Sequence, residues 1–204
     1  MIHIIDYGLG NILAFVNMYK RLNVPVAVAK TPAELAGAGK LILPGVGAFD
    51  HAMQRFQDSG LRETVDRMVQ GGGIPVLGIC VGMQMLADSS EEGVLSGLGW
   101  VPGTVRKLAV DQLPHGTHLP HMGWNDVAPI GIPALFNGLE QDARFYFLHS
   151  FYFEAAEESS VIATADYGRR FACAVNHRNV YGVQFHPEKS HHFGARLLKN
   201  FADL

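Results

Sequence analysis

A cysteine stands between two glycines where an apolar strand passes into a predicted helix, in the segment Gly78-Ile79-Cys80-Val81-Gly82. A G-x-nucleophile-x-G pattern is typical of a sharp turn that leaves a nucleophile strained and closely surrounded by backbone. Partial positive charge at the helix N-terminus favours the thiolate form of such a cysteine, and the backbone N–H of Val81 would point to a developing oxyanion. The alternative is that Cys80 is a small buried apolar residue packed between glycines.

The triplet His186-Pro187-Glu188 offers the base that a cysteine nucleophile requires and a carboxylate to orient it. Proline favours extended geometry for His186, and residues i and i+2 of an extended chain lie on the same side. Glu188 can therefore hold one tautomer of the imidazole and stabilise the imidazolium. The chain has ten histidines, and His186 is distinguished because it follows the apolar run Val180–Phe185.

Two glycine-containing loops follow earlier strands. In Pro44-Gly45-Val46-Gly47 the glycines allow a peptide to turn its N–H, that of Val46, towards the site as a second oxyanion donor. An ordinary glycine turn is the alternative. Gly8-Leu9-Gly10 begins like a dinucleotide-binding fingerprint, but Leu13 occupies the third glycine position, so the pattern for a nucleotide-binding module is incomplete.

The composition argues against several other classes of protein. Hydrophobic residues make up 48% and charged residues 17% of the chain, and a net charge of −3 without long charged runs indicates no nucleic-acid partner. The longest apolar stretch, Ile74–Ala87, is interrupted by Pro75 and by glycines, so we expect no membrane segment. Two distant cysteines form no disulfide framework and favour a reducing cytoplasm. Glu188 with His191 and His192 could imitate metal ligands, but no further cluster supports zinc, and we expect neither a metal nor a cofactor.

Strand-like and helix-like segments alternate in the first half of the chain. The continuous apolar strands predict an α/β fold with a doubly wound, mainly parallel central sheet flanked by helices. Ligands of such sheets bind beyond the carboxyl ends of the strands, which here are Asp6, Pro44–Gly47 and Cys80. The predicted strands are Ile2–Ile5, Val26–Ala29, Leu41–Leu43 and Pro75–Ile79, and the predicted helices are Asn11–Asn23, a short one opened by Thr31-Pro32, Ala48–Gln70 and Cys80–Asp88.

The second half is predicted to be rich in strands and to end in a helix. No linker, repeat or low-complexity tract divides the chain, so we expect one domain over residues 1–204. The predicted strands are Val101–Leu108, Trp124–Val127, Phe145–Phe153, Val161–Ala165, Phe171–Asn176 and Val180–Phe185, with a hairpin connection at Asn176–Asn179 and a last helix over Phe193–Phe201.

Motifs along the whole chain resemble those of the class I (triad) glutamine amidotransferases, and more closely those of the glutaminase subunits of imidazole glycerol phosphate synthase. The motifs are DYGLGN at 6–11, LPGVGAF at 43–49, GICVGMQML at 78–86, SSEEG at 89–93, LPHMGWN at 119–125, FYFLHSF at 145–151 and YGVQFHPEKS at 181–190. The resemblance implies a flavodoxin-like fold and attack of Cys80 on the side-chain amide of glutamine to form a glutamyl thioester. His186 would then protonate the departing ammonia and activate water, with Glu188 orienting it.

The resemblance also implies binding roles. Gln84 and Glu92 match positions that bind the substrate glutamine, and the backbone of His149-Ser150-Phe151 matches the strand lining the same pocket. Ammonia would pass to a TIM-barrel cyclase subunit, which makes imidazole glycerol phosphate and AICAR in histidine biosynthesis. Such subunits are typically poor glutaminases alone, and a peptide rotation in Pro44–Gly47 would complete the oxyanion hole. The positions that match the subunit interface are Tyr7, Asn11, Met122, Trp124, Asn125 and Lys189.

Two departures from the family pattern leave alternatives open. Val81 replaces the leucine usual after the nucleophile, which leaves its N–H available. The segment Lys189–Gly194 is more similar to paralogous subunits that serve surface-polysaccharide amidination, where the ammonia goes to a sugar. A free-standing cysteine hydrolase would leave the glutamine-pocket motifs unexplained, and a non-catalytic subunit would leave the intact Cys80, His186 and Glu188 unexplained.

Overall fold

A central sheet of eleven strands runs through the protein, and one half of it is parallel. The computed structural model describes residues 1–109 and 118–204. The main strand order is β2-β1-β3-β4-β13-β12-β10-β6-β5, and neighbours among the first five are all parallel. These five are β1 (Ile2–Ile5), β2 (Val26–Ala29), β3 (Lys40–Gly45), β4 (Val76–Cys80) and β13 (Val180–Val183).

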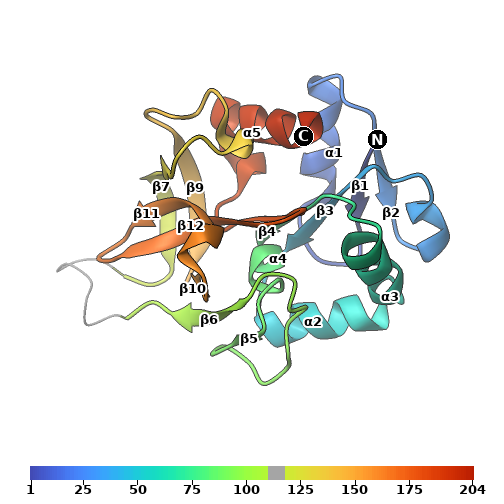
Figure 1. Ribbon diagram of the computed structural model, residues 1–204, viewed down its shortest axis with the longest axis horizontal. Helices are drawn as coiled ribbons and strands as arrows, with labels where there is room; N and C mark the ends of the chain where they lie inside the picture. Colours follow the sequence, from blue (N-terminus) through green and yellow to red (C-terminus); the bar gives the residue numbers. More distant parts are fainter. Residues whose placement is uncertain (110–117) are drawn as a thin grey trace.

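Helices cover both faces of the parallel strands (Figure 1). The helices α1 (Ile12–Arg21) and α5 (His191–Asp203) lie on one face. On the other face lie α2 (Phe49–Asp58), α3 (Arg62–Asp66) and the short α4 (Val81–Gln84). This arrangement confirms the predicted doubly wound α/β class. Within the two described stretches, the helices are all too short or too polar to cross a bilayer.

The second half of the chain extends the sheet with antiparallel strands and adds a separate two-stranded sheet. The antiparallel strands are β12 (Arg170–His177), β10 (Phe151–Ala155), β6 (Gly103–Lys107), β11 (Val161–Asp166) and β8 (Ala128–Pro129), and β5 (Ser89–Ser90) pairs parallel with β6. The separate sheet consists of β7 (His121–Asp126) and β9 (Arg144–His149). Short 3-10 turns lie at Pro32–Leu35, Ala134–Phe136, Glu158–Ser160 and Pro187–Lys189.

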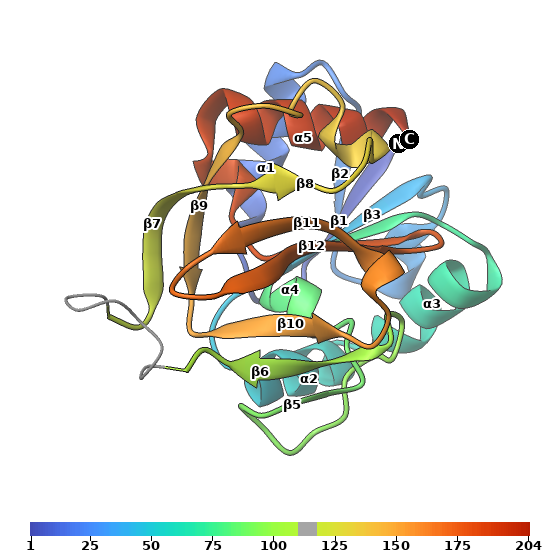
Figure 2. The same cartoon turned by 60° about the vertical axis from the view of Figure 1, so that its left-hand side comes forward.

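The prediction of one strand over Phe145–Phe153 is wrong. The chain forms β9, bends at Ser150 and continues as β10 in the other sheet (Figure 2). The bend is held because the Ser150 carbonyl accepts the Leu108 N–H at 3.0 Å, a contact distant in sequence. This break turns the backbone at 149–151 towards the nucleophile.

Two predicted helices are also shorter than expected. The helix expected over Ala48–Gln70 is divided at Gly60, whose φ of +71° is left-handed, and continues as α3 and a π-helical turn over Arg67–Gly71. The helix expected over Cys80–Asp88 ends as α4 at Gln84 and continues in turns. The macrodipole of so short a helix is smaller than that of a long one, so α4 contributes less to a thiolate than the sequence suggested.

Candidate active site

Cys80 occupies a sharp turn between β4 and α4. Its φ of 56° and ψ of −115° are unusual for a residue with a side chain, and such a conformation costs about 1–3 kcal/mol. A Cβ at Gly78 would lie 2.6 Å from the Gly82 carbonyl oxygen, and a Cβ at Gly82 would overlap the Leu43 carbonyl oxygen. The predicted elbow is therefore present, and both glycines are required because backbone fills the space beside them.

His186 and Glu188 form a buried pair beside this turn. The imidazole Nδ1 lies 2.9 Å from Glu188 Oε1, and the two side chains are only 5% and 3% exposed. Strand β9 fixes the position of His186, because the backbone N–H of His186 donates to the Tyr146 carbonyl of that strand at 2.8 Å. Ser190 adds a clamp: its hydroxyl donates to the His186 carbonyl at 2.6 Å and accepts the Tyr146 N–H at 3.0 Å. The i, i+2 relation predicted from the sequence is thus an actual hydrogen bond.

Opposing effects act on the His186 imidazole. Burial lowers the pKa of His186, but the interactions with Cys80 and Glu188 raise it and prevail, bringing it to about 10. The Nδ1 edge faces Glu188, so Nε2 is the nitrogen left for Cys80. An imidazole held by a carboxylate on one side can serve a cysteine nucleophile as its base on the other.

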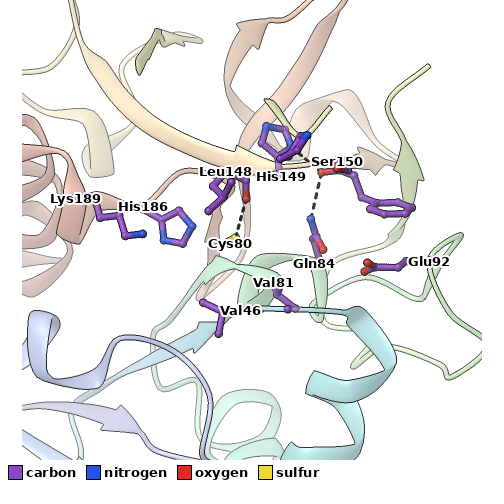
Figure 3. A pocket seen from close by; sticks show the side chains of 13 residues that line it. Val46, Cys80, Val81, Gln84, Glu92, Leu148, His149, Ser150, His186 and Lys189 are labelled. Carbon is purple, nitrogen blue, oxygen red and sulfur yellow. Dashed lines mark hydrogen bonds between the residues drawn. The ribbon is translucent and has the colours of Figure 1, made fainter. Parts of the chain in front are cut away.

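The candidate oxyanion donors border the nucleophile from two elements. Val81 is the first residue of α4, so its N–H lacks an acceptor within the helix. Gly45 is paired with Cys80 in the register of β3 and β4, and Val46 and Gly47 follow it into the cavity wall. Gly47 has a φ of +86°, which favours glycine at this position. The two segments therefore lie on the same side of the sulfur (Figure 3).

A cavity of about 310 Å³ opens at Cys80 and contains the predicted substrate residues (Figure 3). Gln84 Nε2 donates to the Phe151 carbonyl at 3.2 Å, and Glu92 Oε2 accepts the Phe49 N–H at 2.8 Å at the start of α2. Cys80 Sγ lies 3.9 Å from the Leu148 carbonyl oxygen. The lining residues are Val46, Gly47, Cys80, Val81, Gln84, Glu92, Pro120, Leu148, His149, Ser150, Phe151, His186 and Lys189.

Known proteins with the same sequence pattern identify the family. Residues 3–204 match the family glutamine amidotransferase class-I. The chain belongs to this family. It is 64% identical over 204 residues to the imidazole glycerol phosphate synthase subunit HisH of Bdellovibrio bacteriovorus and 52% identical over 204 residues to that of Leptospira interrogans, with 100% of both chains covered in each case. A crystal structure of a glutamine amidotransferase matches the fold with a TM-score of 0.73 at 19% identity, covering 100% of this chain and 99% of that one.

The sequence analysis did not predict Gln184, a residue of the amidotransferase site. Its side chain is fully buried, its Nε2 lies 3.9 Å from Cys80 Sγ, and its Oε1 accepts a hydrogen bond from Gln84 Nε2 at 3.0 Å. A signal was present in the sequence, since Gln184 precedes His186 by two residues and shares its side of an extended chain. Pro120 and Leu148 in the cavity wall were missed as well, and they lie beside predicted residues.

The residues predicted to contact a partner divide into exposed and buried groups. Met122 and Trp124 of the amidotransferase are 64% and 40% exposed, and Asn11 and Lys189 are exposed as well. Asn125 is half-buried. Tyr7 is only 2% exposed; its hydroxyl donates to the Pro44 carbonyl at 2.7 Å, so it supports the Pro44–Gly47 loop from inside.

Metal ligation is not supported in the amidotransferase site. Across residues 1–109 and 118–204, no three or more His, Cys, Asp or Glu side chains are grouped so that they could hold a metal ion. His191 stacks on Trp124 with ring centroids 5.4 Å apart, and His192 lies against Phe193 at 4.0 Å. Both histidines therefore have aromatic neighbours instead of ligand partners.

Proposed function

We propose that this protein is the glutamine-hydrolysing subunit of imidazole glycerol phosphate synthase. It would release ammonia from glutamine and deliver it to a TIM-barrel cyclase subunit, which makes imidazole glycerol phosphate and AICAR. The observation that carries the proposal is the His186–Glu188 pair, hydrogen-bonded at 2.9 Å, in the wall of the cavity into which Cys80 opens. The synthase name of the relatives from Bdellovibrio and Leptospira supports the choice of pathway.

The first half of the reaction forms a thioester. The Cys80 thiolate attacks the side-chain amide carbon of glutamine, forming an S–C bond and placing negative charge on the amide oxygen. The backbone N–H groups of Val81 and Val46 would stabilise that oxyanion. When the tetrahedral intermediate collapses, the C–N bond breaks and the nitrogen takes a proton from His186 Nε2, so ammonia leaves.

The second half releases glutamate. The neutral His186 takes a proton from water as the water oxygen attacks the thioester carbon, and the C–S bond then breaks to regenerate the thiolate and imidazolium. Glu188 orients His186 and stabilises the imidazolium in both halves of the reaction. Protons and bonds balance over the two halves, and no cofactor is needed.

The cavity wall provides groups suited to glutamine itself. The Glu92 carboxylate, which reaches the cavity, would attract the α-ammonium group of the substrate. Gln84 and the backbone of His149–Phe151 would bind the remaining polar atoms, since they line the same cavity. The Glu92 assignment is testable, because Glu92→Gln removes the charge without altering the Cys80 elbow.

The cyclase subunit would bind over the outer face of the small sheet. Alternation along β7 and β9 places Met122, Trp124, Tyr146 and Leu148 on one face, and three of these residues are apolar side chains at least 36% exposed. A contiguous exposed apolar patch is a usual mark of a protein interface. Leu148 belongs both to this face and to the cavity wall, so the patch lies directly beside the nucleophile. Asn11 and Lys189 would contribute from the rim, and Tyr7 would act through the loop that it supports.

The test is glutamate release by this chain alone and in a mixture with the histidine-pathway cyclase subunit and its ribotide ligand. We expect a strong rise in the full mixture only, and no release from Cys80→Ala under any condition. Activity that is insensitive to the cyclase and its ligand would contradict the histidine-pathway assignment and favour the sugar-amidinating system. A mixture that is inactive with wild-type chain would contradict the glutaminase assignment itself.

A further inference from the structure

A continuous row of hydrogen bonds runs from the half-buried Asn125 at one end of β7 to the carbonyl of Phe151. Asn125 Nδ2 lies 3.2 Å from His121 Nε2, and His121 Nδ1 lies 2.8 Å from His149 Nε2. His149 Nδ1 then lies 2.7 Å from the Phe151 carbonyl oxygen. His121 and His149 are 2% and 6% exposed, so water does not compete for these atoms.

The same carbonyl begins a second row, which leads to the nucleophile. Gln84 Nε2 donates one hydrogen to the Phe151 carbonyl at 3.2 Å and the other to Gln184 Oε1 at 3.0 Å. Gln184 Nε2 in turn lies 3.9 Å from Cys80 Sγ. Phe151 therefore joins the two rows, because its carbonyl oxygen accepts from both His149 and Gln84 through its two lone pairs.

The direction of every proton in the histidine row is determined. A carbonyl only accepts, so His149 carries its proton on Nδ1 and accepts at Nε2. His121 must then donate from Nδ1 and accept at Nε2 from the Asn125 amide. The Asn125 amide orientation is fixed independently, since Nδ2 also donates to the Asp166 carbonyl at 2.7 Å and Oδ1 accepts the Asp126 N–H at 2.8 Å.

The surroundings keep both rings neutral and aligned. Burial lowers the pKa of His121 to about 4 and that of His149 to about 3. Near neutral pH both rings are therefore uncharged, and each carries a single N–H. His121 is also stacked between Phe147 and Tyr167, with centroids 4.7 and 4.0 Å away. A neutral ring held in one tautomer can donate in one direction only.

We propose that His121 and His149 are positioning residues whose fixed Nδ1–H tautomers hold the Phe151 carbonyl in place. That carbonyl is the acceptor on which the Gln84–Gln184 pair behind the nucleophile depends. Asn125, at the far end of the row, sets its direction from the inner face of the small sheet, opposite to the face where the partner is proposed to bind. The effect on catalysis rests on the proposed glutamine hydrolysis, whereas the proton arrangement does not.

The proton arrangement is tested by long-range ¹H–¹⁵N spectra of the histidine rings in the free wild-type chain at pH 7. We expect the Nδ1–H tautomer for both rings, with His121→Phe and His149→Gln used only to assign the signals. An Nε2–H tautomer or an imidazolium at either ring would overturn the proposed proton arrangement. This result is independent of glutaminase activity, so it separates a failure of the proposed proton arrangement from a failure of the proposed function.

The positioning effect is tested with a matched pair of variants. His121→Phe keeps an aromatic ring in the stack but removes the donor to His149. Tyr167→Phe keeps the row of histidine hydrogen bonds and removes only the hydrogen bond from the Tyr167 hydroxyl to the His118 carbonyl at 2.8 Å. In the full mixture with cyclase and ligand, we expect kcat/KM for glutamine to fall about tenfold in His121→Phe, as for loss of one buried hydrogen bond, and to stay within about twofold in Tyr167→Phe. The ¹⁵N shift of His149 Nε2 should move in His121→Phe only. Equal losses in both variants, or a loss in neither, would overturn the proposal.

A further variant keeps the proposal falsifiable if His121→Phe does not fold. Asn125→Asp replaces the amide donor with an oxygen that only accepts. His121 Nε2 should then carry a proton, which the same spectra detect. An unchanged His121 tautomer in folded Asn125→Asp would show that Asn125 does not set the direction of the row.

Discussion

Replacing Glu188 with glutamine should separate the charge of the triad carboxylate from its shape. The introduced amide would keep the volume and an oxygen that accepts from His186 Nδ1, now 2.9 Å from Glu188 Oε1, so the tautomer can survive. Only the negative charge is lost. An opposite charge at this distance shifts a pKa by about 1–3 units, so we expect the pKa of His186 to fall by about that amount from about 10.

The catalytic cost follows from the same geometry. Both side chains are almost fully buried, so little solvent screens their interaction, and the imidazolium that forms during ammonia release loses its stabilising charge. Replacing the carboxylate of a comparable triad with its amide lowers kcat by about 10⁴, because the wrong tautomer forms. We expect a fall of about 10²–10⁴ for Glu188→Gln, the smaller value if the amide oxygen faces His186 Nδ1 and the larger if the amide NH2 group does.

The assays are an NMR titration of the His186 ring and stimulated glutamate release, each with wild-type chain and with Glu188→Gln. Glu188→Ala is the comparison that removes acceptor and charge together, and it should be the slower of the two variants. If Glu188→Gln leaves both the His186 pKa and kcat unchanged, Glu188 does not act electrostatically on His186 and the reasoning fails.

Three further predictions follow from the same contacts. Gly82→Ala would push a methyl group into the Leu43 carbonyl and should lower the free energy of unfolding by about 1–3 kcal/mol in urea, whereas Gly71→Ala, which meets open space, should change it by less than about 0.5 kcal/mol. Because the folded-state pKa of His186 is raised, its stabilisation is complete below the unfolded value of about 6.5 and is lost as pH rises towards about 10. The free energy of unfolding should therefore decline over that window by at most about 1.4 kcal/mol per pH unit, less steeply in Cys80→Ala, and a rise would contradict this. Glu92→Gln should keep the bond to the Phe49 N–H but raise KM for glutamine about tenfold, and a normal KM would exclude Glu92 from substrate binding.

The parts of the site that lie close together in sequence were predictable. The Cys80 elbow is encoded by its two flanking glycines, and the His186–Glu188 bond follows from the extended geometry that Pro187 imposes. The parallel core was predictable for a related reason, because continuous apolar strands alternating with helices have few other stable arrangements.

The parts that depend on distant contacts were not predictable in the same way. The run at 145–153 is interrupted only by His149 and Ser150, which a strand can also contain, and the bend at Ser150 comes from its pairing with Leu108. The pairing of His121 with His149 depends on the register of β7 and β9, which no short pattern encodes. Tyr7 matched an interface position, but its burial against Pro44 is visible only once the strands are assembled.

The central claim is that Cys80 is the nucleophile, and covalent labelling tests it most directly. A chloroketone analogue of glutamine would be incubated with the complex of this chain, cyclase subunit and ligand, followed by peptide mass spectrometry. We expect one adduct, on Cys80, protected by excess glutamine and absent from Cys80→Ala; the fully buried Cys173, whose pKa burial raises strongly, should stay unlabelled. Labelling of Cys173 instead, or an unmodified Cys80 in an active complex, would contradict the account.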